Sequence, residues 1–170
     1  ASTWEECKEE WNFAFYYYIL DKYMACLCSP RSLKNGVVLV NDKTQAEILL
    51  CGSCAKDYFD IEIAGIIENS VRRLMKNTRL GMNLECIDYL DRYNILNVRE
   101  IENYDVGLKC RFDEWVMKYK EGINHKLNTF TNYKYRDIFD KIDCLLVEFV
   151  KIGDDEKIKH LTYIRQYILH

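Results

Sequence analysis

The chain has 170 residues, of which 49% are hydrophobic and 30% are charged, and its formal net charge is −3. Acidic and basic residues alternate without forming blocks, which excludes the concentrated basic surface typical of proteins that bind nucleic acids or anionic membranes. The longest apolar run covers residues 13–20 and is much shorter than the roughly 20 residues needed to span a bilayer. We therefore expect neither a nucleic-acid partner nor membrane insertion.

The length and apolar content are sufficient for one ordinary domain with its own core, so we expect a single domain over residues 1–170. One proline and seven glycines impose few breaks on the chain, which favours long helices. The predicted fold class is all-α, a compact bundle or array of six or seven helices. At most one short strand-like segment is expected, near residues 37–40.

The first predicted element is a long helix over about residues 3–27. Ser2 and Glu5 have the spacing of a capping box, and apolar residues then follow at steps of three and four. The aromatic stretch in this segment is apolar on nearly all sides, as in a helix at the centre of a core. Alternatively, Trp11, Phe15 and Tyr18 could form an aromatic wall that binds a ligand.

A turn and a second capping box define the next elements. Residues 34–36 have the composition of a turn that leads into the strand-like segment at 37–40. Thr44 and Glu47 then repeat the capping-box spacing, which predicts a new helix from residue 44. This helix would carry Cys51 and Cys54 about one turn apart.

Helical spacing also dominates the rest of the chain. We predict helices over residues 61–75 and 84–93, the second capped by Asn83, and a helical region from the cap at Asn97 to about Leu127. Gly107 or Gly122 could break this region. Apolar residues at 138, 142, 145 and 149 predict a further helix, which Gly153 separates from the last one.

The chain is rich in cysteine. The eight cysteines are Cys7, Cys26, Cys28, Cys51, Cys54, Cys86, Cys110 and Cys144. Scattered cysteines in even number favour up to four disulfides in an oxidising compartment, and buried thiols in an intracellular protein are the alternative. The start at Ala1 fits either a cleaved signal peptide or a trimmed chain. We expect a secreted protein, with a soluble intracellular one as the alternative.

Four of the cysteines could bind zinc, because four thiolates can form a closed tetrahedral shell around Zn²⁺. The four are Cys26, Cys28, Cys51 and Cys54. However, the first pair is separated by one residue, whereas zinc-binding pairs usually have gaps of two to four residues. We therefore predict no metal at these positions, but either two disulfides or one disulfide and two free thiols.

Cys51 and Cys54 also form a CxxC motif, which at the start of a helix can act as a redox pair. Residues 51–57, CGSCAKD, resemble the CxxCAxD segment of the Erv/ALR family of FAD-dependent sulfhydryl oxidases. Residues 112–127 are similar to the flavin-binding helix of this family, FxxW followed by HNxVNxxL. Trp11 is similarly placed to the early tryptophan of the family.

The resemblance implies a small helical bundle with Cys51 and Cys54 as the catalytic pair beside FAD. It implies four flavin-binding residues, Trp11, Trp115, Asn124 and Lys126. The HN pair of the family falls on residues 120 and 121, which are Lys and Glu, and the histidine that follows the early tryptophan falls on Phe15. These departures remove contacts on which the flavin of the family depends.

No other catalytic motif is visible. The histidines at positions 125, 160 and 170 belong to no nucleophile or metal motif, and the glycines form no phosphate-binding loop. We therefore predict a secreted, disulfide-stabilised helical protein that binds a small apolar ligand or a protein partner, without catalysis or a cofactor. The alternative is an FAD-dependent thiol oxidase, or a degenerate relative, that uses Cys51 and Cys54.

Overall fold

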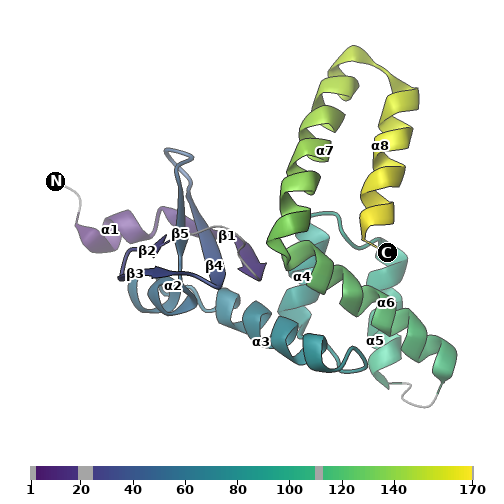
Figure 1. Ribbon diagram of the computed structural model, residues 1–170, viewed down its shortest axis with the longest axis horizontal. Helices are drawn as coiled ribbons and strands as arrows, with labels where there is room; N and C mark the ends of the chain where they lie inside the picture. The colour runs from purple at the N-terminus through teal and green to yellow at the C-terminus, as the bar shows by residue number, and fades with distance from the viewer. Residues whose placement is uncertain (1–2, 19–24, 110–112, 170) are drawn as a thin grey trace.

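The computed structural model describes residues 3–18, 25–109 and 113–169. In these residues, strands occupy much of the N-terminal third and helices follow (Figure 1). The elements are α1 (Trp4–Lys8), β1 (Trp11–Tyr18), β2 (Ala25–Cys26), β3 (Ser29–Ser32), β4 (Asn35–Asn41), β5 (Glu47–Leu50), α2 (Gly52–Phe59), α3 (Ile63–Lys76), α4 (Leu84–Arg92), α5 (Val98–Lys109), α6 (Glu114–Thr131), α7 (Tyr133–Ile152) and α8 (Asp155–Ile168).

The strands form two antiparallel sheets. A three-stranded sheet has the order β1-β4-β5, so β4 is its central strand, and β2 and β3 form a separate two-stranded sheet. The register of β1 and β4 runs from Trp11 opposite Asn41 to Tyr18 opposite Asn35, with an irregularity between Phe13 and Phe15. The central strand is buried over Val37, Val38 and Leu39, as expected for a strand covered on both faces.

The all-α prediction is therefore wrong, and the long helix expected over residues 3–27 is absent from the described part of that range. A single helical turn and a half, α1, is capped by Thr3 and Glu6, one residue later than the predicted capping box. The aromatic run after it forms β1. A short apolar run has no periodicity that separates a buried helix from a buried strand, and its pairing with β4 decided the outcome.

The second predicted helix start, at Thr44, is also wrong. Residues 47–50 form β5, and the turn that precedes it is closed by Asn41, whose side-chain oxygen accepts from the backbone N–H groups of Lys43 and Thr44. Gln45 adopts a left-handed conformation in this turn, with φ of 58°. The polar residues therefore stabilise a hairpin turn. The helix that carries Cys54 begins only at Gly52.

The helices predicted in the C-terminal half are present. Asn97 and Glu100 form a reciprocal capping box at the start of α5, and Gly153 ends α7 in a left-handed conformation. Gly107 lies within α5 and Gly122 within α6, so neither breaks a helix. Among the described helices, none is both long and apolar enough to cross a membrane.

One hydrophobic core joins the larger sheet to the helices. Its centre is an aromatic cluster in which Phe15 of β1 contacts Tyr89 and Phe130, with ring centroids 5.8 and 5.0 Å apart. The guanidinium of Arg136 lies over the Phe15 ring, 4.4 Å from its centroid. These contacts fix the sheet against α4, α6 and α7. The two-stranded sheet and α2 lie on the far side of the larger sheet from α7 and α8 (Figure 1).

Candidate metal centre

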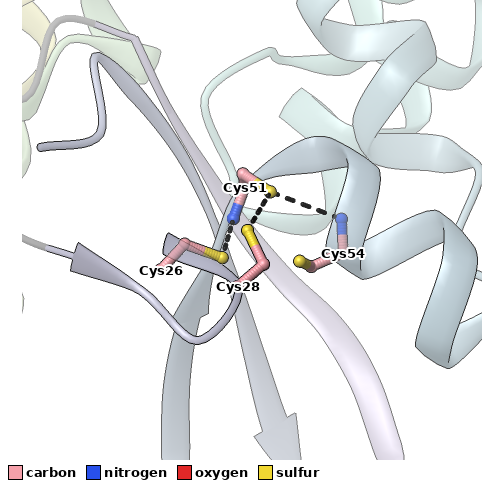
Figure 2. Close-up of side chains that lie close together, drawn as sticks. All are labelled: Cys26, Cys28, Cys51 and Cys54. Atoms are coloured by element: carbon pink, nitrogen blue, oxygen red, sulfur yellow. Dashed lines mark hydrogen bonds between the residues drawn. The ribbon is translucent and has the colours of Figure 1, made fainter. Parts of the chain in front are cut away.

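Four cysteines from two separate segments meet beside the larger sheet. Cys26 ends β2, Cys28 lies in the turn between β2 and β3, Cys51 links β5 to α2, and Cys54 lies in the first turn of α2. Their four Sγ atoms all lie within 4.8 Å of one another. Figure 2 shows the four side chains directed toward a common centre. Groups of this composition can hold a metal ion.

Local backbone structure places each pair. In the β2–β3 hairpin, Cys26 lies opposite Ser29, so Cys28 is held in a tight turn. Cys51 is the N-cap of α2 and has extended backbone angles, and its Sγ accepts a hydrogen bond from the N–H of Cys54 with an N–S distance of 3.4 Å. The first turn of α2 thus brings both of its sulfurs to the same side as the hairpin.

The distances fit a metal better than a disulfide. The Sγ atoms of Cys28 and Cys51 are 3.8 Å apart, whereas bonded sulfurs lie about 2.05 Å apart. Four sulfurs placed tetrahedrally at the usual zinc–sulfur distance of about 2.3 Å lie about 3.8 Å from each other. The separation of Cys28 and Cys51 therefore matches one edge of a zinc tetrathiolate.

The cluster is partly shielded from solvent. Cys26 and Cys54 are buried, Cys51 is half-buried and Cys28 is exposed. Burial opposes ionisation of Cys26, but hydrogen bonds from the backbone N–H groups of Cys28 and Cys51 and from neighbouring thiols outweigh it and lower the pKa of Cys26 to about 7. These donors therefore favour a thiolate at Cys26.

The pKa values of Cys54 and Cys28 are shifted upward, opposite to that of Cys26. Burial, reinforced by hydrogen bonds with the other three cysteines, raises the pKa of Cys54. The pKa of Cys28 is also raised: its hydrogen bond with Cys54 favours the thiolate, but those with Cys26 and Cys51 outweigh it. Without a cation, four thiolates this close repel one another, and a bound divalent cation removes that repulsion.

The predicted disulfides are not found. None of the seven described cysteines is in a disulfide, and Cys110 lies outside the described residues. Cys86 is buried in α4 and Cys144 is exposed on α7, far along the chain from the cluster. The cysteines were expected to form disulfides between distant helices, whereas four of the eight lie together in one cluster.

Three of the four residues that the Erv/ALR resemblance implies for flavin binding do not lie beside Cys51 and Cys54. Trp115 is 71% exposed and stacks on Tyr119. Asn124 is fully buried and holds the loop before α4, because its amide nitrogen donates to the carbonyls of Thr78 and Leu80. Lys126 is paired with a carboxylate of α5. All three lie on α6, away from the cysteine cluster (Figure 1).

The three aromatic residues proposed as a ligand wall do not share a surface. Phe15 is 3% exposed and belongs to the core. Trp11 packs edge-on against Phe59 at one end of β1, and Tyr18 lies at the other end. They are seven positions apart in the strand, a separation of about 23 Å. They were grouped because a helix would have brought them onto one face.

The sequence feature that argued against zinc was the gap of one residue between Cys26 and Cys28. In the turn between β2 and β3 this gap is enough to bring both sulfurs to the same place. No known protein family, curated protein sequence or solved structure matches this chain, so the arrangement of the residues themselves carries the functional argument.

Proposed function

We propose that this protein is a non-catalytic binding protein whose N-terminal part is held together by one structural Zn²⁺ ion. The ligands are the thiolates of Cys26, Cys28, Cys51 and Cys54. The observation that carries the proposal is the approach of all four Sγ atoms to within 4.8 Å of one another. This proposal replaces the expectation that these cysteines form disulfides and bind no metal.

The donor set favours zinc and a structural role. Thiolates are soft ligands, and a tetrahedral set of four sulfurs is typical of Zn²⁺ or of iron–sulfur centres. Four protein ligands close the coordination shell, whereas catalytic zinc keeps one position open for water or substrate. A metal bound in this way supplies folding free energy and performs no hydrolysis.

The β2–β3 hairpin beside the cluster is too short to be stable alone and would be stabilised by a bound metal. Strands of two and four residues form the β2–β3 sheet, and an isolated two-stranded sheet is marginally stable at best in water. Zinc would tie this hairpin to the junction of β5 and α2. Because zinc-bound thiols persist most readily in a reducing compartment, the proposal favours the intracellular alternative over secretion.

Zinc content tests the proposal directly. Native mass spectrometry of the purified full chain should show one zinc ion per chain, and Cys26→Ser or Cys54→Ser should abolish it. Cys144→Ser is the matched control, because this cysteine is exposed on α7 and distant in sequence from the cluster. A full chain that refolds in the presence of zinc and binds none would overturn the proposal.

The alternative function is a thiol oxidase in which Cys51 and Cys54 form the redox pair. It requires a bound flavin, which gives visible absorbance, and a reducible disulfide between these two cysteines. The same purified sample distinguishes the two functions. A coloured protein without zinc would favour the oxidase, and a colourless protein with one zinc ion would favour the binding protein.

A further inference from the structure

Exposed apolar side chains surround a small pocket beside the cysteine cluster. Trp4, Leu27 and Tyr58 are 53%, 81% and 56% exposed. Between them lies a cavity of about 200 Å³, lined also by Leu50, Cys54 and Phe59. We call this cavity, with its three exposed walls, the knuckle pocket. Large apolar side chains gathered on one exposed site are a feature of binding surfaces.

The size of the knuckle pocket limits its ligand. Pockets for small molecules usually have volumes of about 300–1,000 Å³, so this one is small for a free ligand. It has room for a single large apolar side chain of another protein. Anchors of this kind, inserted into a preformed apolar pocket, carry much of the energy of protein interfaces.

The walls of the knuckle pocket are in place before a partner binds. Leu27 lies between two of the proposed zinc ligands, so a bound metal would fix the loop that presents it. Trp4 packs edge-on against Phe59 with ring centroids 5.5 Å apart. A pocket that is already formed costs little ordering entropy when a partner binds.

The sign of the charge around the knuckle pocket indicates the charge of its partner. The stretches of chain around its lining residues, 4–10, 25–34 and 52–60, contain six carboxylates and four basic residues. Lys8 bridges two of the carboxylates, Glu5 and Asp60, and Lys43, from outside these stretches, pairs with Glu10. Four thiolates and one Zn²⁺ add two further negative charges immediately beside the pocket. The neighbourhood is therefore negative, which favours a basic partner.

We infer that the knuckle pocket binds a basic segment of another protein, which inserts one large apolar side chain between Trp4, Leu27 and Tyr58 and places lysine or arginine on either side of it. The inference rests on the proposed zinc site, because the metal both fixes Leu27 and supplies part of the negative charge. Beyond the zinc site, the inference names the kind of partner: a protein segment that is basic and carries one large apolar side chain.

Selection from a phage-displayed library of random peptides, with the full zinc-loaded chain as bait, tests the inference. Enriched peptides should share a large apolar residue flanked by lysine or arginine. Leu27→Ser and Tyr58→Ser should each weaken their binding at least tenfold. Tyr163→Ser is the matched control, because Tyr163 is equally exposed but lies on α8, and its variant should bind like the original chain.

Three results would overturn the inference. These are enriched peptides without the basic flanks, peptides whose affinity neither pocket variant changes, and a selection that enriches nothing. Self-association is a fourth: a dimer in sedimentation that Leu27→Ser dissociates would assign the surface to a second copy of this chain. Zinc content is measured separately on each variant, so loss of peptide binding with zinc retained is distinguished from failure of the metal site.

Discussion

The backbone N–H of Cys51 donates a hydrogen bond to the Sγ of Cys26, with an N–S distance of 3.2 Å. This contact joins the β2–β3 hairpin to the start of α2 across 25 positions of the chain. The donor helps to stabilise a thiolate at Cys26, and a thiolate is the form that binds metal. The hairpin and the helix are therefore already aligned for a shared ion.

Removal of zinc should destabilise the N-terminal part selectively. In hydrogen exchange, a chelator should reduce the protection of residues 25–59, because the short hairpin loses its link to α2. Protection of α6 should change much less, since this helix packs in the core far from the cluster. Zinc added back should restore the protection. Equal loss in both regions would show that the metal stabilises the whole chain.

Asn124→Ala should lower the free energy of unfolding by at least about 2 kcal/mol, measured by urea denaturation. The Asn124 side chain accepts a hydrogen bond from the buried hydroxyl of Tyr104 at 2.6 Å and donates to two partly buried carbonyls. Its removal leaves the Tyr104 hydroxyl without its acceptor, which costs about 1–3 kcal/mol, and the two carbonyls lose their donor. Asn103→Ala, on the exposed face of α5, is the control and should have little effect.

A double-mutant cycle should reveal strong coupling between Glu100 and Lys126. Their side chains are 10% and 7% exposed, and Lys126 Nζ lies 2.6 Å from a carboxylate oxygen of Glu100. Lys126→Met alone should cost about 3–5 kcal/mol, because it leaves a buried carboxylate without its counter-charge. Adding Glu100→Gln should recover part of the loss. Additive effects of the two changes would contradict a coupled buried pair.

Alkaline pH should destabilise the protein through Tyr104. Burial raises the pKa of Tyr104 from 10.0 to about 12, so the folded chain keeps a proton that the unfolded chain loses. The contribution of this proton is complete below pH 10 and is lost as the pH rises through 12, by about 3 kcal/mol in total.

Denaturation between pH 8 and 12 measures this loss. Tyr104→Phe should be less stable than the original chain at pH 8, because Met82 N–H and Asn124 lose their partner. Its stability should also fall less steeply above pH 10. An unchanged slope in this variant would assign the alkaline loss to the other buried tyrosines.

The helices of the C-terminal half could be predicted from the sequence. Their signals are local: Asn97 and Glu100 cap one another, Gly153 ends a helix, and apolar residues repeat at helical spacing in between. Four cysteines with metal-binding potential were also visible, although their spacing argued against zinc. The helical signals depend on residues within a few positions of each other.

The sheet and the cluster of four cysteines were decided by the tertiary structure. The aromatic run of β1 fits a helix or a strand equally well, and only its pairing with the valine-rich β4 makes it a strand. Because residues 25–32 form a hairpin and not part of a helix, Cys26 and Cys28 lie close to Cys51 and Cys54. Long-range pairing leaves no periodic trace in one segment, which is why the sequence alone predicted disulfides where the fold brings four free cysteines together.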